Sequence, residues 1–196
     1  MIPLVYAQRA AELPFWLTTG IWAIGERFLT FRDLRSGAWR SRQDRGSYLW
    51  LVLAVAAGFG AAIALSMWHA LEPPAPWVWL VVGLVIAWAG MLLRAWAVVT
   101  LGRSFTTTVV VRPEQRMVTT GPYRLIRHPS YLGLLIFFLG FGLGLGNPLC
   151  VPAIVVLSLI GLVRRIAVEE AALRRELGDS YVEYARGRSR LIPGVW

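Results

Sequence analysis

The sequence predicts an all-α, polytopic transmembrane bundle of about five membrane helices, including a C-terminal helical hairpin, followed by a cytoplasmic amphipathic C-terminal helix. Hydrophobic residues make up 57% of the 196-residue chain, which is more apolar surface than a soluble domain of this size can bury. These residues are gathered into long stretches, and the arginines are gathered between the stretches. Lipid is therefore expected to be the solvent for much of the chain.

Four of the apolar stretches are clear. Residues 47–71 and 77–101 would each be about 37 Å long as helices, which is enough to cross a bilayer. Residues 131–146 and 149–163 are shorter, and Asn147-Pro148 between them indicates a turn. We interpret this pair as a helical hairpin, either barely crossing the membrane or continuing into the flanking sequence.

A fifth stretch, residues 13–31, carries Glu26 and Arg27 near its end. Two interpretations remain open for it. If it spans, the bundle has five membrane helices, with the N-terminus outside and the C-terminus inside. If it lies in the membrane interface, four helices span and the N-terminus changes sides.

The basic residues indicate the orientation. All of them are arginine, and 17 of the 20 lie in residues 32–45, 100–130 and 164–190. The connection at 72–76 and the Asn147-Pro148 turn carry none. Because positively charged loops stay in the cytoplasm, we expect the three segments to share the cytoplasmic face of the cell inner (plasma) membrane. The net charge of +9 is thereby explained without nucleic acid as a partner.

Glycines recur in the first helix of the hairpin. The pairs Gly140/Gly144 and Gly142/Gly146 have the small-xxx-small spacing that lets helices approach closely. No strand precedes them, so a nucleotide-binding loop is disfavoured. We expect them to serve helix packing.

The segment 121–133, Gly-Pro-Tyr-Arg-Leu-Ile-Arg-His-Pro-Ser-Tyr-Leu-Gly, comes just before an apolar helix. Pro129 keeps His128 out of helical geometry and suits a first helical turn, whose free amides could bind a carboxylate. Tyr123 and Tyr131 add aromatic faces for a purine or a cation. The alternative is a basic juxtamembrane anchor facing lipid headgroups.

A second cluster follows the last apolar stretch. Arg165 and Glu169 are four residues apart, so they share one face of a helix. Either they form an ordinary surface ion pair, or they lie beside the His128 turn and bind a ligand. The tail up to Arg190 is expected to form an amphipathic helix with a break at Gly178-Asp179.

These motifs together resemble the isoprenylcysteine carboxyl methyltransferase family, as a bacterial membrane-embedded member. The pattern is Gly-Pro-Tyr…Arg-His-Pro-Ser-Tyr-x-Gly, a short hairpin, Arg-x-x-x-Glu-Glu-x-x-Leu, Leu-Gly-x-x-Tyr-x-x-Tyr and Leu-Ile-Pro-Gly, over about residues 101–196. The resemblance implies one integrated domain with two parts. Residues 1–100 would be the N-terminal membrane helices, and residues 101–196 the cofactor-binding catalytic half.

The resemblance also implies S-adenosyl-L-methionine as cofactor and assigns residues to it. Those expected to bind the cofactor are Gln115, Arg116, Met117, Val118, Tyr123, His128, Pro129, Ser130, Tyr131 and Glu169. Arg165 is expected to bind the substrate, and Arg165 and His128 are the candidate catalytic residues. The implied partner besides the bilayer is a lipophilic small molecule or a lipidated acceptor.

The chemistry implied is carboxyl O-methylation. A carboxylate with a pKa of about 4 is already ionised at neutral pH, so its methylation from a sulfonium needs neither a metal nor a base. The remaining requirements are alignment and removal of water. With only His69, His128 and Cys150 as nitrogen or sulfur candidates, no metal centre is expected. An amine or thiol acceptor would need a proton acceptor, for which His128 or Glu170 is nearest.

Three alternatives remain at this level. One is a phospholipid or thiol methyltransferase. Another is a membrane-embedded, NADPH-dependent reductase of related architecture, which 196 residues make less favourable. The third is a non-enzymatic membrane subunit whose arginine-rich loops hold a partner or anionic lipid.

Overall fold

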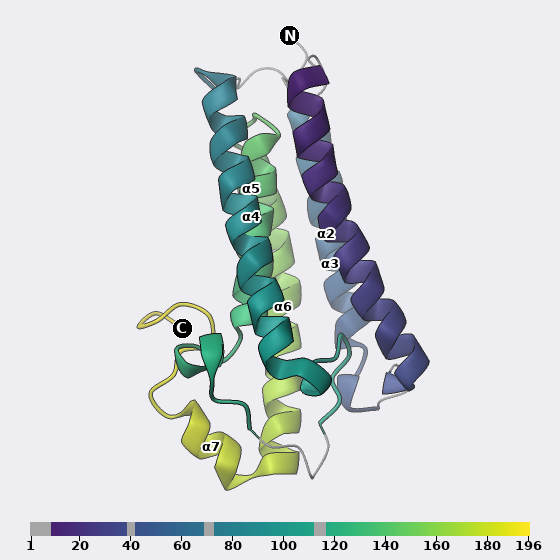
Figure 1. The fold of residues 1–196 in the computed structure, drawn as a ribbon, viewed down its shortest axis with the longest axis vertical. Coiled ribbons are helices and arrows are strands. Elements are labelled where there is room, and N and C mark those ends of the chain that lie inside the picture. The colour runs from purple at the N-terminus through teal and green to yellow at the C-terminus, as the bar shows by residue number, and fades with distance from the viewer. Residues whose placement is uncertain (1–8, 39–41, 69–72, 112–116) are drawn as a thin grey trace.

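The computed structural model describes residues 9–38, 42–68, 73–111 and 117–196. Its long helices pack side by side as a bundle, and a shorter helix lies across one end (Figure 1). In chain order the α-helices are α2 (Arg9–Ser36), α3 (Ser47–Ser66), α4 (Pro76–Leu101), α5 (Pro129–Gly144), α6 (Cys150–Leu177) and α7 (Asp179–Ala185). The described residues contain no β-strand, so the all-α prediction is confirmed.

Three stretches, Ser47–Ser66, Pro76–Ser104 and Cys150–Leu177, are long and apolar enough to cross a membrane. Helix α5 is apolar but shorter, at 16 residues. The multi-pass membrane prediction is therefore confirmed.

Helix α2 runs lengthwise in the bundle. The indole N–H of Trp88 donates to Thr18 at 3.2 Å, and Arg94 pairs with Glu26 further along both helices. Contacts that advance together along α2 and α4 require the two helices to run parallel. Figure 1 shows α2 lengthwise beside the other long helices, but α2 is not among the three stretches that are apolar enough to cross, so its spanning stays a prediction.

The arginine-rich segments gather at one end of the bundle, as their charge predicted. The α2–α3 connection, the chain between α4 and α5, and α7 all lie at the lower end in Figure 1. The α5–α6 turn lies at the other end, where Asn147 donates to the carbonyl oxygens of Leu65 and Trp68 at 2.9 Å each.

Glycine allows α4 and α5 to pack backbone against backbone. A Cβ on Gly90 would lie 2.4 Å from the Phe137 nitrogen, and one on Gly140 would lie 2.4 Å from the Ala87 nitrogen. The packing role predicted for Gly140 is thereby confirmed. For Gly146 it was wrong: a Cβ there meets nothing within 4 Å, and its φ of +74° serves the turn that follows α5.

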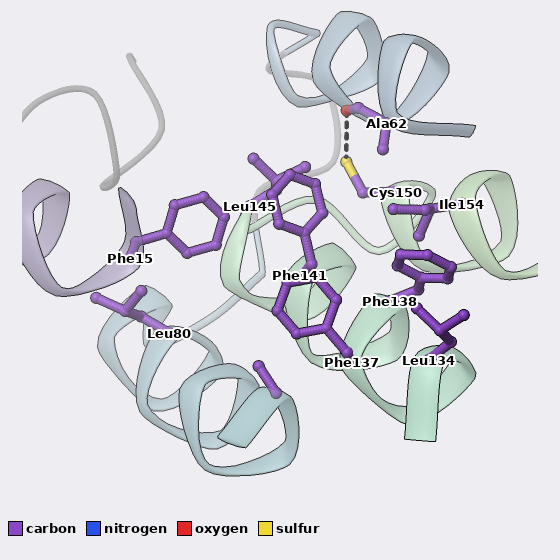
Figure 2. Close-up of a cluster of buried hydrophobic side chains, with 11 residues drawn as sticks. Phe15, Ala62, Leu80, Leu134, Phe137, Phe138, Phe141, Leu145, Cys150 and Ile154 are labelled. Atoms are coloured by element: carbon purple, nitrogen blue, oxygen red, sulfur yellow. Dashed lines mark hydrogen bonds between the residues drawn. The ribbon is translucent and has the colours of Figure 1, made fainter. Parts of the chain in front are cut away.

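The core lies toward the end opposite the arginines. Figure 2 shows Phe141 of α5 beside Phe15 of α2, and Phe138 of α5 beside Ile154 of α6. Buried Cys150 donates its thiol to the Ala62 carbonyl at 3.1 Å, which joins α6 to α3 (Figure 2).

The last helices agree with the prediction in part. Helix α6 continues unbroken to Leu177, which confirms the alternative in which the hairpin continues into the flanking sequence. The predicted break is confirmed at Gly178, whose φ is +53°. The tail, however, is helical only to Ala185. Beyond α7 it folds back on the His128 segment, where the Arg127 and His128 amides donate to the Ser189 and Arg190 carbonyls at 2.9 Å.

Candidate functional site

Two pockets meet at the arginine-rich end of the bundle. The end pocket lies between the 101–131 chain, α6 and α7, and has an empty volume of about 830 Å³ including its opening. The bundle pocket lies between α2, α3, α4 and α5, and has about 1290 Å³ on the same measure. Four residues line both: Phe105, Thr106, Tyr131 and Arg165. These four form the partition between the pockets.

Most of the predicted cofactor residues come together in the end pocket. Those that line it are Met117, Val118, Tyr123, His128, Ser130, Tyr131 and Glu169. Pro129 does not line it and instead begins α5. Gln115 and Arg116 lie outside the described residues. The roles assigned to these residues stay predictions, but the sequence grouped them correctly in space.

The Tyr131 hydroxyl links the two members of the second motif. It donates to the Glu169 carboxylate at 2.5 Å and accepts from Nε of Arg165 at 3.0 Å. Arg165 and Glu169 therefore do share one face of α6. The surface ion-pair alternative is wrong, because the Arg165 side chain is only 2% exposed.

Arg165 is held from several sides. Its Nη1 donates to Asp44 and, at 2.9 Å, to Ser47, while Nη2 donates to the Thr107 carbonyl at 2.7 Å. With Nε on Tyr131, a guanidinium with five N–H groups has at most one left for a ligand. A substrate carboxylate could therefore receive a single hydrogen bond from Nη2, without the two-pronged grip that a free arginine offers.

Asp44 supplies the charge opposite Arg165. Burial opposes ionisation of its carboxyl, but the Tyr48 amide, the charge of Arg165 and the Val109 amide outweigh burial and lower the pKa below its ordinary value. Asp44 is therefore an anion at neutral pH, and the pair is neutral as a whole.

The start of α5 offers fewer free amides than predicted. Pro129 has no N–H, and the amides of Tyr131 and Leu132 both donate to the His128 carbonyl at 3.1 Å. Only the Ser130 amide is left for a ligand. The expectation of several free amides in this turn was wrong. The tight turn between His128 and Tyr131 uses the Tyr131 amide, and the first bond of the helix uses the Leu132 amide.

His128 is a buried wall residue of the end pocket. Its ring stacks on Tyr131 with centroids 5.6 Å apart, and Nε2 lies 3.3 Å from the Glu170 carboxylate. Glu170 also accepts from Arg127 at 2.8 Å, Arg174 at 2.9 Å and Arg190 at 3.1 Å. A carboxylate held by three guanidinium groups is a structural centre, so Glu170 is a poor candidate for a proton acceptor.

The C-terminal segment closes the end pocket. Tyr181 and Tyr184 of α7 line it. The Tyr184 hydroxyl donates to the Tyr123 carbonyl at 2.9 Å. Burial raises the pKa of Tyr184 to about 12, so this donor stays protonated at neutral pH. Sequence patterns had placed these tyrosines on an amphipathic face, without indicating a pocket.

The bundle pocket is apolar at one end and charged at the other. Trp22 of α2 stacks against Phe59 of α3 at 5.4 Å and against Phe137 of α5 at 4.7 Å. At the charged end, Nη2 of Arg94 donates to Glu26 at 2.7 Å and Nη1 to the Ser130 hydroxyl at 2.7 Å. In the sequence both charges lie inside apolar helices, where ionisable residues are paired or functional. Their pairing could not be predicted from it.

The comparisons with known proteins converge on one family. A sequence model of the isoprenylcysteine carboxyl methyltransferase family matches residues 81–175. The protein-S-isoprenylcysteine O-methyltransferase B of Arabidopsis thaliana is 41% identical over 115 residues, 58% of this chain and 58% of that protein. A probable protein-S-isoprenylcysteine O-methyltransferase of Oryza sativa subsp. indica is 42% identical over 54% of this chain and 56% of its own length. The Tribolium castaneum enzyme is 35% identical, over 58% of this chain and 41% of its own length.

A solved structure agrees. The eukaryotic intramembrane Ras methyltransferase, an isoprenylcysteine carboxyl methyltransferase, superposes with a TM-score of 0.60 at 29% identity, covering 74% of this chain and 52% of that one. The chain thus spans about half the length of the relatives it matches. These relatives are eukaryotic, so they give no support to the expectation of a specifically bacterial member. The resemblance recognised from the motifs is supported by these matches: residues 81–175, just under half of the chain, are similar to the isoprenylcysteine carboxyl methyltransferase family.

Proposed function

We propose that this protein is an integral membrane S-adenosyl-L-methionine-dependent methyltransferase that methylates the carboxyl group of a lipophilic or lipidated acceptor. One observation carries the proposal. A pocket with a carboxylate, aromatic rings and apolar walls meets a second, largely apolar pocket inside the bundle, and only four residues separate them. Two unlike substrates could therefore react across a thin partition.

The end pocket suits the cofactor by the chemistry of its side chains. Glu169 offers a carboxylate to an ammonium or to ribose hydroxyls. Val109, Val111 and Leu173 form an apolar wall of the kind that an adenine ring contacts. Tyr131 presents a ring near which a sulfonium cation is favoured. When bound, the cofactor supplies an electrophilic methyl group on that sulfonium.

The bundle pocket suits the acceptor's lipid chain, because Trp22, Phe59 and Phe138 line its apolar part. In this proposal the acceptor carboxylate lies beside Arg165, whose remaining N–H can orient it. The reaction balances without an acid or a base: the carboxylate oxygen forms a bond to the methyl carbon as the carbon–sulfur bond breaks and sulfur keeps the electron pair. The surrounding residues exclude water and align the two groups.

The relatives' names indicate an S-isoprenylcysteine carboxyl as the model acceptor. The test uses purified protein in lipid nanodiscs, methyl-labelled S-adenosyl-L-methionine and farnesylcysteine, with farnesylcysteine amide as the control. We expect label in the product that is released as methanol by alkali, which identifies an ester, and none with the amide. Alkali-stable label would point to an amine or thiol acceptor. Binding of NADPH without methyl transfer would overturn the proposal in favour of a reductase.

We further propose that the site faces the cytoplasm of the cell membrane, because the arginine-rich loops surround it. Cysteines introduced at exposed Ala75 and Ser180, at opposite ends of the bundle, test this with a membrane-impermeant thiol reagent. The native Cys150 is buried and should not react. In intact cells we expect labelling at position 75 alone. Labelling at position 180 from outside would reverse the orientation.

A further inference from the structure

The extended segment 105–111, Phe-Thr-Thr-Thr-Val-Val-Val, runs along both pockets. Phe105 and Thr106 line both, Thr107 lines the bundle pocket, and residues 108–111 line the end pocket. Any displacement of this segment therefore changes the two pockets together.

Side chains from the end of α2 and from the α2–α3 connection bind the backbone of this segment, as a neighbouring strand would. Asp33 accepts from the Thr107 amide and, at 2.7 Å, from its hydroxyl. Asp44 accepts from the Val109 amide at 3.0 Å. Gln43 satisfies both backbone groups of Val111, at 2.7 Å and 3.1 Å. Backbone groups away from water need such partners, and here alternate residues of the segment receive them.

Asp44 does more than hold the segment. Its Oδ1 accepts from Val109, from the Ser47 hydroxyl at 3.1 Å and from Nη1 of Arg165. One buried carboxylate thus joins the wall of the end pocket to the arginine of the partition. Asp44 lies outside residues 81–175, the part that matches the family model.

We propose that Asp44 is a positioning residue for methyl transfer, which orients Arg165 toward the acceptor carboxylate; the proposal rests on the proposed function. Asp44 touches neither substrate, because it lines neither pocket. It sets the direction of the last free Nη2–H of Arg165 by fixing Nη1. A rotated guanidinium loses its hydrogen bond to the acceptor carboxylate, and losing a hydrogen bond between charged groups weakens binding about tenfold to a hundredfold.

The test is a mutant cycle of Asp44→Asn and Arg165→Gln, with Asp179→Asn at the exposed start of α7 as the matched control. Asp44→Asn should lower kcat/KM for farnesylcysteine about tenfold to a hundredfold, mainly through KM. Its affinity for S-adenosyl-L-methionine, measured by calorimetry, should stay within about threefold of the parent. In the Arg165→Gln background, Asp44→Asn should have no further effect, because the residue it positions is already gone.

Two further measurements separate positioning from a general loss of structure. Hydrogen exchange should speed up at the Val109 amide in Asp44→Asn and leave the α5 amides unchanged. Ser47→Ala keeps both charges and removes one contact of Arg165 and one of Asp44. It should raise the acceptor KM about threefold. If the charge variants do not fold, this variant still tests whether Arg165 must be held in place.

An unchanged acceptor KM in both Asp44→Asn and Ser47→Ala would overturn the proposal. So would an equal further loss from Asp44→Asn in the Arg165→Gln background. If the parent protein itself transfers no methyl group, the proposed function fails instead. The hydrogen-exchange difference at Val109 can still be measured in that case. If exchange there is unchanged, Asp44 does not hold the 105–111 segment.

Discussion

Two helix–helix interfaces of the bundle, which we call seams, are built differently. Helices α4 and α5 meet through glycines, and their backbones touch along the contact. Helix α2 meets α3 and α5 through the rings of Trp22, Phe59 and Phe137, beside the bundle pocket. A polar bond between Thr30 and Tyr48 at 3.1 Å and the Glu26–Arg94 pair add to this second seam.

The difference separates two tasks. A backbone-to-backbone seam has no slack, so it fixes the start of α5 and with it His128 and Tyr131. A seam of aromatic rings beside a pocket can rearrange around a bound apolar group. Under the proposed function, the cofactor would bind on the fixed seam and the acceptor on the adaptable one.

The largest expected effect comes from breaking the fixed seam. Gly90→Val would place a methyl-bearing carbon where backbone atoms of α5 already lie, 2.4 Å from its Cβ position. Side-chain overpacking costs about 1–3 kcal/mol, and backbone atoms yield less, so we expect no folded protein. Gly60→Val is the control, because a Cβ at Gly60 on exposed α3 surface meets nothing within 4 Å. Size-exclusion profiles in detergent compare them, and a monodisperse Gly90→Val protein would contradict the comparison.

The next effect concerns the ion pair that closes the adaptable seam. Glu26→Leu leaves Arg94 with a side chain 10% exposed and no carboxylate partner, which should lower the free energy of unfolding by about 2 kcal/mol. The double variant Glu26→Leu/Arg94→Met removes both charges and should recover most of that loss. Thermal unfolding of the parent, of Glu26→Leu, of Arg94→Met and of the double variant measures the coupling. Additive losses would show that the pair contributes little to the seam.

A third effect tests the end pocket as the proposed cofactor site. Glu169→Gln keeps an acceptor for the Tyr131 hydroxyl but removes the charge, so affinity for S-adenosyl-L-methionine should fall about tenfold to a hundredfold. Glu183→Gln, on the exposed face of α7, should bind like the parent. Calorimetry on both proteins measures this, and equal affinities would remove Glu169 from the cofactor site.

The helices could be predicted from the sequence because lipid demands long apolar stretches, and four of them lie close to where the apolar runs lie. The charged turns before the Gly178 break were also predicted as helix, from their amphipathic pattern. That they continue α6 without interruption could not be decided, because hydropathy falls where the charges begin although Glu170 among them is buried. The proposed division into residues 1–100 and 101–196 stays a prediction.

The site was predictable where its motifs are contiguous. His128, Ser130, Tyr131 and Glu169 were found because chain neighbours or helical spacing bring them together. The pairing of Asp44 with Arg165 could not be predicted from the sequence, because 121 residues separate them. Pairings of that kind depend on how helices pack, and a single sequence carries no record of the packing.

The smallest expected effect concerns the basic segment that precedes α5. Arg124 and Arg127 look alike in the sequence, as two charges of one basic segment. In the structure Arg127 donates to Glu170 and, at 2.8 Å, to the Arg188 carbonyl, whereas the exposed Arg124 side chain has no ion pair within the described residues. Arg127→Gln should therefore lower the free energy of unfolding by about 1 kcal/mol and loosen the tail that carries Arg190. Arg124→Gln should change it by less than about 0.5 kcal/mol. Thermal unfolding of both variants at one salt concentration compares them. Equal shifts would mean that the segment is held by its charge alone, and that its contacts with α6 and the tail contribute nothing.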